Sequence, residues 1–241
     1  MAKIPNRPED IFDEFKSDFL SLYGDQLESI ILYGSGARGD YIRKKSDINF
    51  MLVLTLEGIQ NLSAAFPLVK KWRKSNVATP LFVTTEYIES SLDSFPIEFL
   101  NMKSAYKVVY GKDALGHLNI DRNHLRLQVE AQIKGKLLHL REQFLGTLGK
   151  KQALKNLLKA TVPAFTSIFA ALLTLKDIEV TGQGVQVLPK TAQVFELDEV
   201  VFKNLLALRE GSLDPSETEL VKLAEKLIHE IRKCALLVDK L

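Results

Sequence analysis

The chain has a single cysteine, Cys234, among its 241 residues. One cysteine cannot form an intrachain disulfide, and this low usage fits a reducing compartment. Cys234 lies within a helical pattern of apolar residues, so we expect it to be buried rather than reactive.

The sequence also lacks an excess of charge of either sign. Its 32 Lys and Arg residues nearly balance its 30 Asp and Glu residues, which leaves a net charge of +2. Such a balance gives no general electrostatic reason to expect binding to nucleic acids or to an anionic membrane.

Long hydrophobic runs are missing as well. The first residues, MAKIPNRPEDIFDEF, have no apolar core of the kind found in signal peptides. The longest run without a charged residue, Ala160–Leu175, is too short to span a bilayer and contains Pro163. We expect this run to form a buried helix, and we expect the protein to be cytoplasmic.

What the sequence does contain is enough apolar residues for a folded protein of two domains. The hydrophobic fraction is 46%, and 241 residues exceed the length of one small domain. Near Gly116–Asp121 the pattern changes from mixed strands and helices to long helices alone. We therefore predict an α+β fold, in which residues 1–118 form a domain with a small mixed sheet and residues 119–241 form an all-α helical bundle.

The most informative stretch reads SIILYGSGARGDYIRKKSDINFMLVL. Its two ends, Ser29–Tyr33 and Phe50–Leu54, are rich in β-branched, aromatic and other apolar residues, which predicts two buried strands. Between them, Gly34-Ser35-Gly36 forms a turn of small residues whose backbone amides can approach the phosphates of a ligand. Asp47 and Asn49 stand two residues apart at the start of the second strand, so their side chains should point to the same side of the sheet. A phosphate-sized turn thus faces a carboxylate that can hold a cation.

These residues resemble the signature of the polymerase-β-like nucleotidyltransferases, which is a hydrophobic strand, Gly-Ser, a spacer, and Asp-hydrophobic-Asp or Glu. The chain has Gly34-Ser35, eleven intervening residues, and then Asp47-Ile48-Asn49. The family has a second carboxylate where this chain has the amide of Asn49. The helical second half is similar in outline to the helical domains of minimal and aminoglycoside-type nucleotidyltransferases.

The resemblance implies that the turn holds a nucleoside triphosphate and that the second strand holds Mg²⁺. Gly34 and Ser35 would bind the terminal phosphates. Arg38 would add a cation that cannot titrate, with forked donors suited to phosphate oxygens. Ser46 is a further nucleotide-binding candidate, although a serine at this place is typical of turns and caps. Asp47 would ligate Mg²⁺ and take part in catalysis.

A third acidic residue is expected from Pro96–Leu100, which we interpret as a fourth strand. Glu98 is an acid in an otherwise apolar stretch, and its burial is costly unless it is paired or ligates a cation. The segment Pro96-Ile97-Glu98 resembles the Pro-Val-Glu segment of streptomycin-type adenylyltransferases. The resemblance implies that Glu98 completes a metal site with Asp47 and Asn49, or acts as the general base.

The other elements of the first half follow from apolar spacing and from helix start and stop signals. Helices are predicted from Pro8 to Gly24 and over Gly58–Lys74. The second ends in a basic cluster that either complements the helix dipole or binds phosphate. The remaining predicted elements are a strand over Thr79–Thr84, a short helix from Thr85 to Ser94, and a last strand over Tyr106–Gly111.

In the second half, apolar residues recur every three or four positions from Leu125 to Leu148, which predicts a long helix. Gln152–Leu175 is apolar on all sides, as expected of the central helix of a bundle, and Pro163 should kink it. The remaining predicted segments are a loop over Asp177–Pro189, one or two short helices over Thr191–Leu208, and a last helix opened by Asp214-Pro215-Ser216-Glu217.

Asn49 leaves the activity open at this point. An amide oxygen can ligate a cation, but it lacks the charge that holds two divalent ions close together. The loss of a preorganised electrostatic group typically costs about 10²–10³ in rate, or ~3–4 kcal/mol. The enzyme could work with one bound metal, Glu98 or another acid could compensate, or the domain could bind a nucleotide without transferring it.

Two other classes of protein stay open. Gly34–Gly39 also spells the G-x-G-x-x-G of dinucleotide-binding domains, with Glu57 at a distance suited to a ribose contact. Only Asp40–Ser46 separates this turn from the next strand, which is too short for the helix of a βαβ crossover. The other class is a non-catalytic binding or regulatory module, such as the antidote of a toxin pair.

We therefore predict a nucleotidyltransferase that transfers a nucleoside monophosphate, in the first place AMP from ATP, to a hydroxyl acceptor with Mg²⁺. The sequence does not identify the acceptor. The main alternative is a non-catalytic nucleotide-binding or regulatory module with a degenerate metal site at Asn49, and a dinucleotide-binding domain comes after it. A homodimer is compatible with the sequence, and no membrane association is expected.

Overall fold

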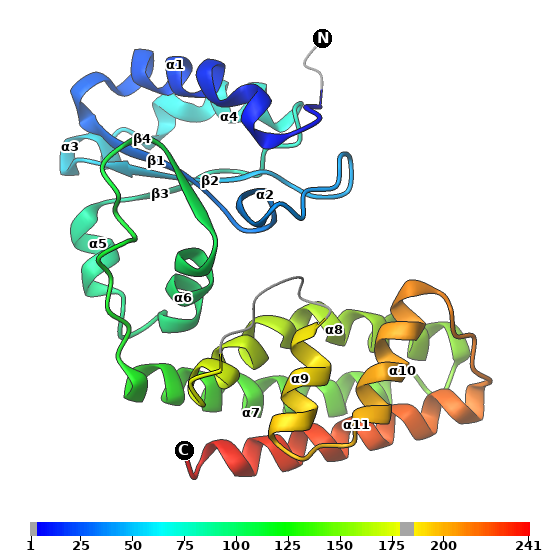
Figure 1. The fold of residues 1–241 in the computed structure, drawn as a ribbon. Helices are drawn as coiled ribbons and strands as arrows, with labels where there is room; N and C mark the ends of the chain where they lie inside the picture. Colours follow the sequence, from blue (N-terminus) through cyan, green and yellow to red (C-terminus); the bar gives the residue numbers. More distant parts are fainter. Residues whose placement is uncertain (1–3, 179–185) are drawn as a thin grey trace. The chain divides into compact units, whose positions relative to one another are not determined.

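The computed structural model describes residues 4–178 and 186–241. The contacts between residues divide the chain into two compact units, Met1–Ile120 and Asp121–Leu241. In Figure 1 the N-terminal unit has a sheet between helices, and the regular elements described in the C-terminal unit are helices. The predicted α+β architecture with a helical bundle is confirmed.

The N-terminal unit is organised around a four-stranded mixed sheet with the order β3-β2-β1-β4. The central strand β1 (Leu27–Tyr33) pairs antiparallel with β2 (Asn49–Leu54) on one side and with β4 (Tyr106–Gly111) on the other. The edge strand β3 (Leu81–Val83) pairs with β2 in parallel. All four strands were predicted, with ends that differ by a few residues.

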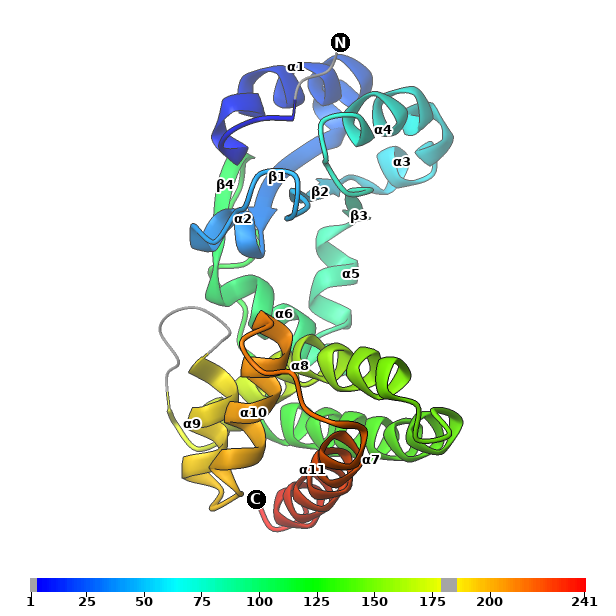
Figure 2. The same ribbon diagram turned by 90° about the vertical axis from the view of Figure 1, so that its right-hand side faces the viewer.

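One face of this sheet is covered by two helices, α1 (Phe12–Tyr23) and α4 (Phe66–Arg73) (Figures 1 and 2). Alternate residues of β1 and β2 point to this face and form a core with aromatic side chains of both helices. Phe15 stacks on Phe50 with 4.0 Å between the ring centroids, and the Trp72 ring meets Phe15 edge-on at 5.2 Å. Burial of one such side chain contributes about 2–3 kcal/mol, so this cluster anchors both helices to the sheet.

A polar contact at the edge of the same core joins the two helices. Asp18 of α1 accepts hydrogen bonds from the Nζ of Lys71, at 2.6 Å, and from the indole Nε1 of Trp72, at 2.9 Å. The indole N–H is thereby satisfied, although Trp72 is buried.

The opposite face of the sheet is covered by α5 (Thr85–Ser90) and α6 (Pro96–Ser104). The strand predicted over Pro96–Leu100 is therefore wrong, because this segment is the first part of α6. A proline fits the first turn of a helix, and an apolar run of five residues does not distinguish a strand from a helix. In this helix the side chains of Ile97 and Phe99 are buried.

The single helix predicted over Gly58–Lys74 is also wrong. The structure has α3 (Leu56–Ile59), the 3₁₀ turn η3 (Leu62–Ala65) and then α4. The first of these begins at Thr55, whose hydroxyl accepts a hydrogen bond from the amide of Gly58 at 3.3 Å. Pro67 lies in the first turn of α4, where its missing N–H costs nothing.

The start of the chain agrees with the predicted helix. A 3₁₀ turn, η1 (Pro8–Ile11), leads into α1, and α1 ends at Gly24, which has a φ of 52°. A short 3₁₀ turn, η2 (Gly24–Gln26), then leads into β1.

The C-terminal unit is a bundle of helices. Its central member is α8 (Lys151–Thr174), which contacts each of the other helices that the structure describes in this unit (Figure 2). By length and composition α8 could cross a membrane, but more than half of its most apolar part is buried in the bundle, as expected of a core helix. The surrounding helices are α7 (Arg122–Gly146), α9 (Val187–Val194), α10 (Glu199–Glu210) and α11 (Glu217–Val238).

The predicted helices of this unit are found close to their expected ends. The loop predicted over Asp177–Pro189 lies in part outside the described residues, and its last part is the beginning of α9. Helix α11 begins with a capping box, in which the Ser216 hydroxyl accepts from the Glu219 amide and the Glu219 carboxylate accepts from the Ser216 amide.

Candidate functional site

The candidate site begins at the turn after β1. Gly34 has φ 75° and ψ −147°, a backbone conformation that residues other than glycine avoid. Its carbonyl oxygen accepts hydrogen bonds from the amides of Ala37 and Arg38, both at 3.1 Å, and this closes the short helix α2 (Ser35–Arg38). The amide of Ser35, at the first helical position, has no carbonyl partner within the helix. Such an amide can bind an anion.

Gly36 has a different role from Gly34. It is buried, and a Cβ at this position would lie 3.2 Å from Cγ of Pro8 and 3.3 Å from Cδ1 of Leu32. The absence of a side chain therefore lets α2 pack closely against β1 and η1. Close packing therefore explains why the turn has a glycine at position 36.

Arg38 ends α2 at the surface. Its Nε lies 3.4 Å from Oδ2 of Asp40, and its side chain is 40% exposed. An exposed pair of this kind contributes little to stability, so the guanidinium is available for another anion.

Ser46 closes the loop that connects α2 to β2. Its hydroxyl accepts a hydrogen bond from the amide of Ile42 at 3.0 Å, and its carbonyl accepts one from the side-chain amide of Asn76 at 2.8 Å. These contacts agree with a turn residue. The assignment of Ser46 as a nucleotide contact stays a prediction.

Asp47 and Asn49 flank Ile48, whose side chain is buried in the core beneath α1 and α4. The backbone here is fixed, because Ile48 donates to the carbonyl of Asn76 and accepts from the amide of Ala78, both at 3.0 Å. Side chains alternate along a strand, so Asp47 and Asn49 point to the opposite face, as the sequence predicted. Asp47 is exposed and Asn49 is half-buried.

The turn and the start of β2 meet across the β1–β2 hairpin. Tyr33, the last residue of β1, is in register with Asn49. The side-chain nitrogen of Asn49 lies 3.5 Å from the position that a Cβ of Gly34 would occupy. The amide that replaces the second carboxylate of the signature is thus directed at the phosphate-sized turn.

Glu98 lies on α6 rather than on a strand, but α6 covers the same face of the sheet to which Asn49 points. Phe99, the next residue, packs in the core of that face together with Met51 and Val53 of β2. Glu98 is half-buried and lies in the first turn of its helix, where the helix dipole favours a negative charge. The helix therefore brings Glu98 to the side of the sheet that the hypothesis requires.

Tyr33 is a neighbour of the site that sequence reasoning missed. It is in register with Asn49 on one side and with Tyr106 on the other, and it packs against the core beneath α5 and α6. Burial raises the pKa of its phenol. The sequence could have indicated this role, because Tyr33 directly precedes Gly34. Strand alternation from Ile31 also places Tyr33 on the face of the sheet that α5 and α6 cover.

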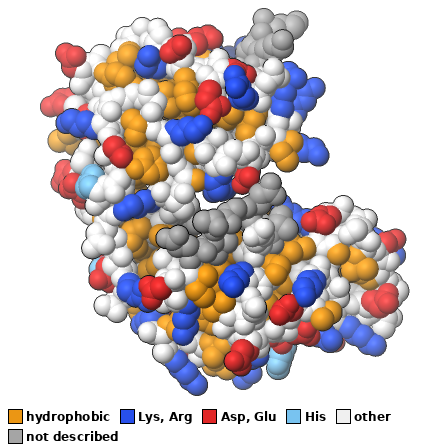
Figure 3. Space-filling model, viewed as in Figure 1, with side chains coloured by type: hydrophobic (Ala, Val, Ile, Leu, Met, Phe, Trp, Pro, Cys, Tyr) orange, Lys and Arg blue, Asp and Glu red, His pale blue; other side chains and the backbone are white. Residues whose placement is uncertain are grey.

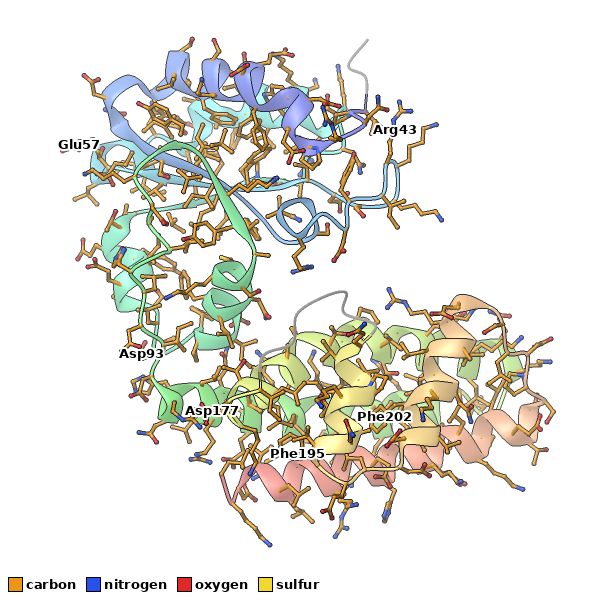
Figure 4. The ribbon with its side chains drawn as sticks, viewed as in Figure 1. Arg43, Glu57, Asp93, Asp177, Phe195 and Phe202 are labelled. Atoms are coloured by element: carbon orange, nitrogen blue, oxygen red, sulfur yellow. The ribbon has the colours of Figure 1, made fainter. Side chains whose placement is uncertain are left out.

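The topology excludes a dinucleotide-binding crossover at the glycine turn. Strands β1 and β2 are antiparallel neighbours, whereas the G-x-G-x-x-G of that fold joins two parallel strands through a full helix. Glu57 follows the far end of β2, so it lies at the other end of the sheet from Gly34. Figure 4 shows Glu57 and Arg43, which belongs to the loop after α2, at opposite ends of the unit.

The hairpin, the glycine turn and the mixed sheet, followed along the chain by a helical unit, make up a fold that also occurs in a solved structure. A solved structure with this fold is spectinomycin adenyltransferase AAD(9) from Enterococcus faecialis, determined with ATP and spectinomycin. The likeness has a TM-score of 0.55 and covers 94% of this chain and 100% of that chain. The two sequences are 12% identical, so the likeness concerns the fold alone. No family model and no curated protein matches the sequence.

Proposed function

We propose that this protein is a nucleotidyltransferase that transfers a nucleoside monophosphate, AMP from ATP, to a hydroxyl group with the help of Mg²⁺. The observation that carries the proposal is the approach of Asn49 to Gly34 across the β1–β2 hairpin, with Asp47 two residues away on the same side. The fold of AAD(9), whose structure contains ATP, agrees with it.

In this proposal the glycine turn binds the triphosphate. The amide and the hydroxyl of Ser35 donate to the terminal phosphates, and Gly34 allows the backbone to come close to them. Arg38 is one helical turn away and adds forked donors with a permanent charge. Gly36 does not contact the phosphates, because its position is used for packing.

Two residues at the start of β2 and one on α6 have the donor atoms that Mg²⁺ requires. Asp47 and Glu98 offer carboxylate oxygens and Asn49 offers an amide oxygen, and Mg²⁺ prefers one or two carboxylates with phosphate and water oxygens. A bound Mg²⁺ would neutralise charge on the triphosphate during transfer. The described residues contain no cluster of three or more His, Cys, Asp or Glu side chains that could hold a metal, so the set depends on the amide of Asn49.

The acceptor hydroxyl must lose a proton during the transfer. Asp47 and Glu98 are the two carboxylates on this side of the sheet that the proposal assigns to the site. Either can accept the proton when it lies within hydrogen-bond reach of the hydroxyl.

Asn49 supports a second candidate, a module that binds a nucleotide without transferring it. With one charge fewer than the family signature, the site has less negative potential to hold cations against the phosphates. The expected loss of about 10²–10³ in rate would leave binding intact.

Titration of ATP with and without Mg²⁺ tests the proposal first. The wild type should bind ATP, and Mg²⁺ should strengthen the binding. Asp47→Ala should abolish the effect of Mg²⁺. Asp25→Ala is the matched control, because Asp25 is an exposed aspartate that precedes the opposite end of β1.

Comparison with Asn49→Asp separates the two candidates. If the wild type binds ATP and transfers no AMP to any acceptor in a panel, while Asn49→Asp does, the protein is the binding module. If the wild type transfers AMP, the second carboxylate is dispensable. Absence of ATP binding by the wild type would refute both candidates.

A further inference from the structure

A group of cations beside Asp47 is not used by the proposed function. The residues of this group, which we call the basic surface, are Arg43, Lys44 and Lys45 of the loop before β2, and Arg73 and Lys74 at the end of α4. All five are exposed. Figure 3 shows Lys and Arg side chains along this edge of the N-terminal unit, and Figure 4 shows Arg43 on the loop.

The structure brings two basic segments together that are separated by about thirty residues in the sequence. The side-chain amide of Asn76 donates to the carbonyl of Ser46 at 2.8 Å, and Ile48 forms a parallel bridge with Val77. Lys45 precedes Ser46 directly, and Lys74 lies two residues before Asn76. The loop and the end of α4 are therefore neighbours on one surface.

The loop itself is held in place. The hydroxyl of Tyr41 donates to the carbonyl of Pro5 at 3.3 Å, and the Nε of Arg43 donates to the carbonyl of Ile4 at 3.1 Å. The Ser46 hydroxyl closes the turn at Ile42. Lys44 has a φ of 66°, a conformation that a lysine adopts only where its surroundings impose it.

The cations of the basic surface form no ion pair with the residues that the structure describes. Among the described residues, no carboxylate lies within ion-pair distance of any of the five cations, whereas Arg38 pairs with Asp40 and Lys71 with Asp18 and Glu14. Arg43 and Arg73 donate to neutral oxygens instead. Residues 1–120 contain fourteen Lys and Arg and fifteen Asp and Glu, a net charge of −1, so the basic surface is a local concentration within a unit of balanced charge.

We propose that the basic surface binds the phosphate backbone of a single-stranded nucleic acid. Five exposed cations on two adjacent segments form an open surface, which suits several successive phosphates of a strand. The contacts would be to phosphates, so binding is independent of sequence. The net charge of the whole chain, +2, did not indicate this local concentration of cations, because its two segments are far apart in the sequence.

Fluorescence anisotropy with a labelled single strand of about 20 nucleotides tests this proposal. Each phosphate contact adds about −0.7 to the slope of log K against log[salt], so five contacts give a slope of about −3.5 and a loss of about 100-fold in affinity between about 50 and 200 mM salt. The double variant Lys45→Gln/Lys74→Gln should lower the affinity at about 50 mM salt at least tenfold and reduce the slope by about 1.4.

Lys112→Gln is the matched control. Lys112 is an exposed lysine directly after β4, and Gly111 pairs with Ser29 at the end of the sheet remote from Asp47. This variant should keep the affinity within about twofold of the wild type. Thermal unfolding of each variant verifies that the fold is retained.

Three results would overturn the proposal. They are a wild type that does not bind the strand at about 50 mM salt, a control that weakens binding as much as the double variant, and displacement of the strand by saturating ATP. ATP binding is measured separately, so a failure of the proposed function leaves this test unaffected, and the reverse holds too.

Discussion

Gly34 and Asn49 show how closely the two halves of the candidate site are connected. A Cβ at position 34 would lie in ordinary contact with the Asn49 side chain, at 3.5 Å, so there is space for a methyl group. The obstacle to substitution is the backbone, because φ 75° with ψ −147° is strained for any L-residue.

Gly34→Ala should therefore destabilise the protein by about 1–3 kcal/mol, with relaxation of the turn as the cause. Relaxation moves the Ser35 amide, so ATP binding should weaken in the same variant. Urea unfolding and an ATP titration measure the two effects. An unchanged unfolding midpoint would show that the turn does not depend on this conformation.

Asp18 allows a prediction about stability away from the site. Asp18→Ala leaves the buried Trp72 N–H without its acceptor, which should cost about 1–3 kcal/mol. Asp18→Asn keeps an acceptor oxygen and loses only the charge that faces Lys71, so its cost should be below about 1 kcal/mol. Equal costs for the two variants in urea unfolding would contradict this explanation.

The pH dependence of this contact follows from Lys71. Hydrogen bonds to Asp18 and then to Glu14 raise the pKa of Lys71 above its ordinary value. The stabilisation is therefore complete below the unfolded pKa, about 10.4, and is lost as the pH rises through the raised folded pKa. Measurements at pH 7 record the full difference between the variants.

At the level of single residues, the sequence predicted part of the site. Strand alternation predicted that Asp47 and Asn49 share one face, and the burial of Ile48 between them agrees with this prediction. The packing role of Gly36 was not predictable, since it depends on Pro8, which approaches only in the folded chain. Which residues contact a ligand stays a prediction.

Among the elements, α6 shows where sequence patterns are insufficient. Pro96–Leu100 has the composition of a short strand, and the family resemblance called for one. The segment is helical, and Ile97 and Phe99 are buried in that conformation. The long helices were predicted well, because apolar residues that recur every three or four positions over about seven turns fit a helix and do not fit a strand.

Two glycines of the C-terminal unit give matched predictions about helices. Gly135 lies inside α7 with open space around it, so Gly135→Ala should stabilise the protein by about 1 kcal/mol. Gly211 also has open space, but it ends α10 with a φ of 85°. Gly211→Ala should destabilise by about 1 kcal/mol, because an L-residue is unfavourable there. Thermal unfolding should shift in opposite directions, and shifts of the same sign would refute the assignment.

For the whole molecule, each unit has a hydrophobic core of its own. In the N-terminal unit the cores lie on the two faces of the sheet, and in the C-terminal unit the core surrounds α8. Asp121, the first residue of the second unit, caps α7 by accepting hydrogen bonds from the amides of Asn123 and His124. The sequence predicted the change of pattern near Gly116–Asp121.

We therefore expect residues 121–241 to fold when expressed alone. The fragment should unfold in one cooperative transition and have the circular dichroism of a helical bundle. A fragment of residues 1–120 should retain ATP binding if the proposed site lies within it. A non-cooperative melt of the helical fragment would show that its core needs the other unit.

The loop between α2 and β2 has a consequence for the evolution of this protein. The strands on either side of it are in a register fixed by the core, and the loop is closed by its own hydrogen bonds at Ser46. Residues 40–45 can therefore change in length and charge while Gly34, Asp47 and Asn49 keep their positions. Descendants of one ancestral hairpin could acquire new partners by altering this segment alone, without rebuilding the glycine turn beside it.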